Sequence, residues 1–285
     1  MILKKKKNIT VVIPSLGSSV LLKTIFFLNQ GLVKPDKILI CLPKGSFAKI
    51  GQIKKFRNVK IIQCPEKGQV KQKIYGFKQV VTKYTLQMDD DILVSKTCLK
   101  EFLRAANSKS KKNAFGGYLK STNNNLTKYE NPSLFNQILN LLLHGTKYIK
   151  MRSVLNTGIP TNLFDQKNFF LVKTEWINGI LFTHSINLLN YDYYNIEGKA
   201  YNEDVIHSGI LRKKKITLWI NNKAICSEQR QNLIHQNEKY NIQYWINIYK
   251  TRSKIIQFYK GSKFRMTFLI LLEIGKSLLI KNRLN

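Results

Sequence analysis

The sequence predicts an α/β fold in which a mostly parallel sheet is flanked by helices, with a basic helical appendage at the C-terminal end. Short β-branched runs recur about every 25 residues in the first half, and amphipathic segments separate them. A chain of 285 residues, 44% of them hydrophobic, can bury a large core. After residue 226, helical periodicity is mixed with Lys and Arg. We therefore expect one large domain over 1–226 and a basic, largely helical extension over 227–285.

The first half of the chain predicts alternating strands and helices. The expected strands are Ile9–Ile13, Lys37–Leu42, Val59–Cys64 and Tyr84–Met88. The expected helices are Val20–Asn29, Phe47–Phe56 and Gln69–Val81. Right-handed crossovers between parallel strands would place these helices on both faces of the sheet.

The second half is less regular. Lys120–Lys128 is polar and rich in Asn, which predicts a loop, and Leu134–His144 predicts a helix. Regular structure is expected again at Trp176–Phe182, in a helix from about Asp204 to Arg212, and in a strand over Ile216–Ile220.

Targeting signals and cysteines bear on the compartment. The apolar run Ile9–Ile13 ends at Pro14 and is too short for a signal peptide. Met266–Leu272 is about half the length that spans a bilayer, so we expect no transmembrane helix. The chain contains four cysteines that lie far apart in the sequence: Cys41, Cys64, Cys98 and Cys226. Their spacing predicts buried thiols in a reducing, cytoplasmic compartment.

The net charge of +32 has three interpretations. A general bias toward Lys, Asn and Ile would produce it without any function. An anionic membrane or a lipid-linked acceptor would attract it. Nucleic acid is the least favoured partner, because the basic residues are spread along the chain without a recognised nucleic-acid-binding motif.

Three consecutive carboxylates, Asp89, Asp90 and Asp91, follow the predicted strand Tyr84–Met88. Ligands of open α/β sheets bind beyond the carboxyl ends of strands. Because the three charges repel one another, a bound cation would stabilise them, and Mg²⁺ and Mn²⁺ prefer oxygen ligands. A solvated turn or a helix N-terminus explains the same residues equally well.

A second acidic pair, Glu203 and Asp204, precedes a short amphipathic segment. One interpretation is a helix N-terminus at which acids are favoured by the dipole. The other is a general base for a hydroxyl group.

The ordered segments ITVVIPS, GQVKQKIYGF, YTLQMDDDI, EWINGILFTHS and GKAYNEDVIHS resemble glycosyltransferase family 2 over roughly residues 8–226. The resemblance implies a GT-A fold, a catalytic domain over 1–226 and a nucleotide-sugar donor. It also implies that Asp89 and Asp91 hold Mg²⁺ or Mn²⁺, with Asp91 the more direct ligand.

The resemblance also implies a donor pocket. Pro14 and Ser15 stand where the family's loop borders the nucleotide, and Gln69, Lys73 and Asp90 are assigned to the same pocket. Lys73 stands where the family commonly has Arg, although an ordinary exposed helix lysine would also explain it. The family's nucleobase-reading Asp has no counterpart in Cys41–Ser46, so the nucleotide stays open.

For the acceptor side, the resemblance assigns Asp204 as the general base of an inverting transfer, and Glu203 is either a ligand of the acceptor or an orienting residue. Asn178–Gly179 resembles the segment below the acceptor, and Trp176 is either a sugar-stacking surface or part of the core. Ser227 stands where many relatives have a metal-binding His, so a third ligand stays open.

The resemblance implies transfer of sugar to a glycan, polysaccharide or lipid-linked acceptor, as in cell-surface polysaccharide biosynthesis. The alternatives are a nucleotidyltransferase on a similar sheet, and a non-enzymatic basic protein that binds nucleic acid or membrane. Ile255–Leu284 alternates aliphatic, aromatic and basic residues. It predicts either peripheral contact with the anionic inner face of a membrane or a helix packed on the protein.

Overall fold

The computed structural model describes residues 9–46, 50–120, 132–150, 152–161, 169–183, 202–229 and 242–284. The chain forms two compact units, each assembled from separate stretches of sequence. Unit 1 contains Met1–Ser121 and Gln166–Arg230, and unit 2 contains Thr122–Asp165 and Gln231–Asn285.

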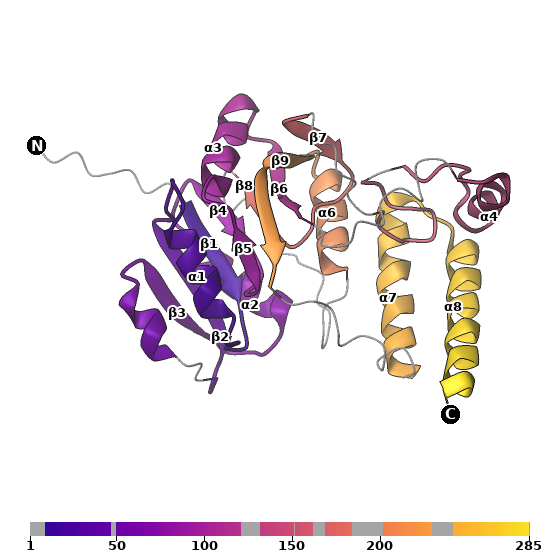
Figure 1. Ribbon diagram of the computed structural model, residues 1–285, viewed down its shortest axis with the longest axis horizontal. Coiled ribbons are helices and arrows are strands. Elements are labelled where there is room, and N and C mark those ends of the chain that lie inside the picture. The colour runs from indigo at the N-terminus through magenta and orange to yellow at the C-terminus, as the bar shows by residue number, and fades with distance from the viewer. Residues whose placement is uncertain are drawn as a thin grey trace, which may run out of the picture. The chain divides into compact units, whose positions relative to one another are not determined.

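Unit 1 is built on a nine-stranded sheet (Figure 1). The strand order is β3-β2-β1-β4-β8-β6-β9-β5, and β7 pairs with β9 outside this order. β1 to β4 pair in parallel, as do β6 and β9, and the other pairings are antiparallel. The strands are β1 Ile9–Pro14, β2 Lys37–Pro43, β3 Val59–Cys64, β4 Tyr84–Gln87, β5 Ile92–Val94, β6 Asn113–Leu119, β7 Leu171–Thr174, β8 Leu181–Thr183 and β9 Thr217–Glu228.

Helices pack against the strands of unit 1. All residues of β1 are buried, which is the pattern of a strand covered on both faces. α2 packs closely on β1 and β2, because a Cβ at Gly76 would lie 2.5 Å from Val12 Cγ1 and 2.6 Å from Cys41 Sγ. The helices of this unit are α1 Leu21–Asn29, the 3₁₀ helix η1 Ile50–Lys55, α2 Gln69–Phe77, α3 Cys98–Ser108 and α6 Glu203–Lys213.

The α/β prediction with flanking helices is confirmed, and two helix boundaries differ from expectation. α2 ends at Phe77, before the predicted Val81, whose side chain is 79% exposed. The predicted helix Phe47–Phe56 is only the short η1, and residues 47–49 lie outside the described residues.

Three elements of unit 1, β5, α3 and β6, were not predicted from the sequence. The residues that α3 buries are spaced three or four apart, a pattern visible in the sequence: Cys98, Leu99, Phe102, Ala105 and Ala106. The predicted strand Ile216–Ile220 continues as β9 to Glu228. Trp176–Phe182 leads into β8 and is mostly irregular. The predicted loop Lys120–Lys128 lies outside the described residues apart from its first residue.

Unit 2 contains α4 Leu134–His144, α7 Ile242–Tyr259 and α8 Lys263–Leu284. α7 and α8 lie side by side (Figure 1). Their shared core contains Trp245, Ile248, Ile256, Met266 and Ile270. In the described part of the chain, we find no helix that combines the length and the apolar composition needed to cross a bilayer.

Candidate active site

Asp89, Asp90 and Asp91 lie in the short link between β4 and β5. β4 runs parallel to β1, and the Met88 amide continues this pairing by donating to the Val12 carbonyl oxygen at 3.1 Å. The three carboxylates therefore lie at the carboxyl edge of the parallel strands, where open α/β sheets bind their ligands.

Asp90 connects this link to the loop after β1. The Ser15 hydroxyl donates to Asp90 Oδ2 at 2.5 Å, and the Thr24 hydroxyl on α1 donates to the Asp90 carbonyl oxygen at 2.8 Å. Ser15 Oγ also accepts from the Gly17 amide at 3.0 Å. Pro14 is the buried last residue of β1, and its contribution is to place Ser15 beside the acidic link.

Lys73 joins the two acidic groups that the sequence separates. Its side chain is fully buried, and Nζ lies 3.0 Å from Glu203 Oε1 and 3.4 Å from Asp89 Oδ1. Gln69, one turn earlier on α2, donates from Nε2 to Asp89 Oδ1 at 2.9 Å. The interpretation of Lys73 as an exposed helix lysine is therefore wrong, because its ammonium is an internal counter-ion for two carboxylates.

Glu203 and Asp204 begin α6, where acidic side chains are favoured by the helix dipole. Asp204 Oδ1 accepts from the Val205 amide at 2.8 Å. Burial, with the neighbouring Glu203 charge, raises the pKa of Asp204 to about 8. A carboxyl group that titrates near neutral pH is suited to proton transfer.

His207 lies one turn further along α6 and is buried. Burial, together with the Lys73 charge, lowers its pKa to about 3. The ring is therefore neutral at physiological pH.

Glu228, the last residue of β9, is an acidic neighbour of this link. It pairs with Ile92 between the antiparallel strands β9 and β5, and the next amide, from Gln229, donates to the Asp91 carbonyl oxygen at 2.9 Å. Burial, followed by the charges of Asp91 and Asp89, raises the pKa of Glu228. Three carboxyl groups thus influence one another at this edge.

The carboxylates fit a divalent cation that a ligand helps to hold. Among the described residues, no group of three or more His, Cys, Asp and Glu side chains forms a complete metal site. Mg²⁺ sites that include substrate phosphates need only one or two protein carboxylates. The charges of Asp91 and Asp89 contribute, after burial, to the raised pKa of Glu228, and a cation would relieve this repulsion. Oxygen donors of this kind suit Mg²⁺ or Mn²⁺.

Asn178–Gly179 lies against the same group. A Cβ at Gly179 would lie 2.8 Å from Asp89 Oδ2, so the absence of a side chain leaves room for that carboxylate. Trp176 is partly buried in the preceding segment, and its amide donates to the Thr174 hydroxyl at 3.4 Å.

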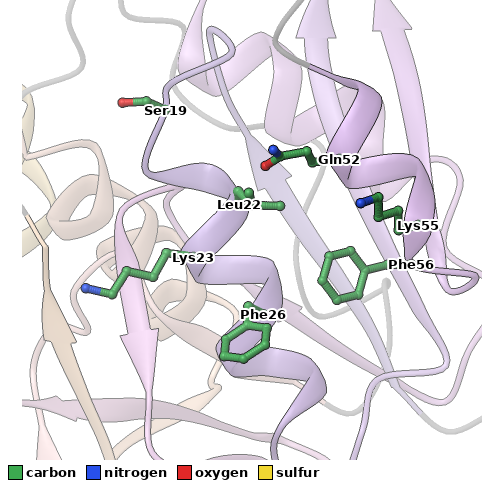
Figure 2. A pocket seen from close by; sticks show the side chains of 7 residues that line it. All are labelled: Ser19, Leu22, Lys23, Phe26, Gln52, Lys55 and Phe56. Atoms are coloured by element: carbon green, nitrogen blue, oxygen red, sulfur yellow. The ribbon is translucent and has the colours of Figure 1, made fainter.

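A separate hollow of about 550 Å³ lies between α1 and η1. Figure 2 shows Leu22 and Phe26 of α1 on one side of it and Gln52, Lys55 and Phe56 on the other. None of its lining residues is acidic, so it is distinct from the carboxylate group.

The sheet, its flanking helices and the carboxylates at the strand ends are the arrangement of a GT-A protein. Known structures share this fold at low sequence identity. S. aureus TarS 1-349 matches 98% of this chain and 73% of its own length, with a TM-score of 0.51 and 14% identity. The mannosyltransferase PcManGT from Pyrobaculum calidifontis, in complex with GDP-Man and Mn²⁺, matches 99% of this chain and 77% of its own, with a TM-score of 0.53 and 8% identity.

GalNAc-T7, solved with UDP, GalNAc and Mn²⁺, has a TM-score of 0.60 and 12% identity over 89% of this chain and 48% of its own length. A comparison with curated protein sequences finds no match.

Residues 45–168 match the model of glycosyl transferase family 2. Residues 45–168 therefore resemble a family 2 domain, and the solved structures show that the chain shares their fold. The matched region includes Gln69, Lys73 and the Asp89–Asp91 link, and it ends before Glu203.

Proposed function

We propose that this protein is a glycosyltransferase that moves a sugar from a nucleotide-sugar donor to a glycan, polysaccharide or lipid-linked acceptor, with inversion and with a divalent cation. The observation that carries the proposal is the contact of Lys73 with both Asp89 and Glu203. This contact joins a carboxylate link at the strand ends to a second acidic pair 114 residues further along the chain (203 − 89). Such an arrangement of carboxylates can hold a diphosphate donor on one side and an acceptor hydroxyl on the other.

On the donor side, Asp91 and Asp89 are the residues that would hold Mg²⁺ or Mn²⁺, and Glu228 is close enough to contribute charge. A bound divalent cation would supply stabilisation of negative charge on the departing diphosphate. Ser15 and Asp90 fix the loop that borders the nucleotide, through their hydrogen bond of 2.5 Å. Gln69 and Lys73 orient Asp89 and offset its charge.

On the acceptor side, Asp204 is the proposed general base and Glu203 the residue that orients it. A base must lie opposite the leaving group for a single displacement with inversion. The raised pKa of Asp204 lets it accept a proton from the attacking hydroxyl and release it near neutral pH. Activity should therefore rise as the pH increases from neutral toward 8.

We place the protein in the cytoplasm, in peripheral contact with the inner face of an anionic membrane. This location is supported by the net charge of +32 and by the Lys and Arg residues of the C-terminal helices. A lipid-linked acceptor would be reached there.

The test is hydrolysis and transfer with a panel of nucleotide sugars, with Mn²⁺, with Mg²⁺ and with excess chelator. We expect turnover that depends on the metal and is lost in Asp91→Asn, because the variant removes a carboxylate charge at the diphosphate site. The melting temperature of the variant, measured alongside, should stay close to that of the wild type. Full turnover in excess chelator would contradict the proposal. Release of pyrophosphate from a nucleoside triphosphate would favour a nucleotidyltransferase.

A further inference from the structure

α4 in unit 2 exposes its apolar side chains and turns its polar side toward the protein. Leu134, Phe135 and Leu142 are 73%, 72% and 67% exposed, and no residue of the helix is buried. The less exposed positions include Gln137 and His144. This orientation is the reverse of that expected for a helix packed on a protein core.

Polar contacts hold α4 in this orientation. His144 Nδ1 lies 3.0 Å from the Thr157 hydroxyl, and the Arg265 guanidinium on α8 donates to the Leu141 carbonyl oxygen at 2.7 Å. Gly145, at φ +73°, ends the helix in the left-handed conformation that its lack of a Cβ permits. The apolar side is therefore left outward by a defined set of contacts.

α8, which contacts α4, has two apolar faces. One face buries Met266 and Ile270 against Trp245, Ile248 and Ile256. The other face is exposed, and its apolar residues are spaced three, four or seven apart along the helix: Phe264, Phe268, Leu271, Leu272, Leu278 and Leu279. A Cβ at Gly275, within this stripe, would meet nothing within 4 Å. We call these residues and the exposed apolar residues of α4 the outer apolar surface.

An exposed apolar surface of this extent on two touching helices requires a partner. The charges of unit 2 indicate which partner. Lys147, Lys150, Lys263 and Lys276 are exposed. Among the described side chains of unit 2, Glu273 is the one acidic residue, and Arg252 pairs with it at 3.0 Å.

A second copy of the chain fits this surface poorly. Each copy has a net charge of +32, and lysine is depleted in interfaces between proteins. An anionic bilayer fits it well, because interfacial helices combine an apolar face with flanking Lys and Arg. Tyr148, which is 61% exposed directly after α4, is of a residue type enriched at the membrane–water boundary.

We propose that the outer apolar surface of α4 and α8 docks on an anionic lipid bilayer, with its side chains in the region between headgroups and acyl chains. The inference rests on the membrane contact of the proposed function, and it adds α4 as a docking element. It does not depend on the transfer chemistry.

The first experiment measures binding to vesicles of phosphatidylcholine and phosphatidylglycerol, and to vesicles of phosphatidylcholine alone. Phe135→Ser with Leu142→Ser should weaken partition into the anionic vesicles by about a hundredfold, since each substitution removes a large apolar side chain from the lipid. The matched control is Leu32→Ser with Val81→Ser, which changes two exposed apolar residues of unit 1 and should leave binding unchanged. Equal binding by both double variants would overturn the proposal.

The second experiment reports insertion directly and excludes a purely electrostatic contact. A polarity-sensitive fluorophore is attached to Phe135→Cys or Leu278→Cys, with Val81→Cys as the control, since the native cysteines are buried. Anionic vesicles should shift the emission to shorter wavelength at the first two positions and not at the third. A dimer in solution that already shields position 135 would overturn the proposal. Donor hydrolysis by the same samples separates a failure of docking from a failure of the proposed transfer.

Discussion

Replacing Lys73 by Met tests whether this buried ammonium holds the two acidic groups together. The substitution keeps the length of the side chain and removes its charge. Among the described residues, Lys73 is the one cation that forms an ion pair with Glu203, whose side chain is 9% exposed, whereas Asp89 is 33% exposed and keeps its hydrogen bond from Gln69. Most of the stability lost in Lys73→Met should therefore come from the unpaired charge of Glu203.

Breaking a buried ion pair by removing one partner costs about 3–5 kcal/mol. Asp89 stays in contact with solvent and with Gln69, so we expect a loss at the lower end of this range. The free energy of unfolding should fall by about 3 kcal/mol at pH 8, and the melting temperature should fall by about 6–12 °C.

The assay is urea unfolding followed by circular dichroism at pH 8. The double variant Lys73→Met with Glu203→Gln should recover most of the lost stability at pH 8, because it leaves no buried charge without a partner. Two results would refute this reasoning. The first is a free energy of unfolding for Lys73→Met within about 0.5 kcal/mol of the wild-type value. The second is a double variant whose loss of stability equals the sum of the losses of the two single variants.

Three further predictions concern the same pocket. Asp204→Asn should lower kcat on the order of 10²–10⁴-fold with donor affinity almost unchanged, and a large loss of donor binding with turnover preserved would show that the residue is not the base. Gly179→Ala should lower turnover with only a small change in melting temperature, because the new Cβ would lie 2.8 Å from Asp89 Oδ2. Unchanged kinetics would mean that the carboxylate can move aside. The pKa of His207 is about 3 in the folded protein and near 6.5 in the unfolded chain. Between these two pH values the unfolded chain binds more protons than the folded protein. The free energy of unfolding therefore decreases as the pH falls from 6.5 to 3. His207→Gln should reduce this slope by up to about 1.4 kcal/mol per pH unit, and identical slopes in acid titrations would contradict the prediction.

The parallel part of the sheet was predictable because its signal is local. Each of β1, β2 and β3 is a short apolar run followed by a turn or helix, and these runs identify strands without knowledge of their partners. The antiparallel pairings carry no such signal. β4 pairs with β8, for example Thr85 with Thr183, and only the folded chain brings these segments together.

The carboxylates of the site were also visible in the sequence, but their connection was not. Lys73 lies three residues after Val70 and four before Phe77, both buried, so its place on the inner face of α2 could have been noticed. A lysine is almost never fully buried unless it is paired, which made the exposed interpretation reasonable. Glu228 had no comparable signal, because its place beside Asp91 depends on the register of β9 against β5.

The Lys73 contact has a consequence for the order in which substrates act. One ammonium pairs with Asp89 on the proposed donor side and with Glu203 on the proposed acceptor side. A ligand that draws Asp89 toward itself leaves Lys73 to pair more strongly with Glu203, and a ligand that engages Glu203 does the reverse. Thermodynamic reciprocity then requires that each substrate changes the affinity for the other by the same factor. Under the proposed assignment, the donor and the acceptor would therefore not bind independently.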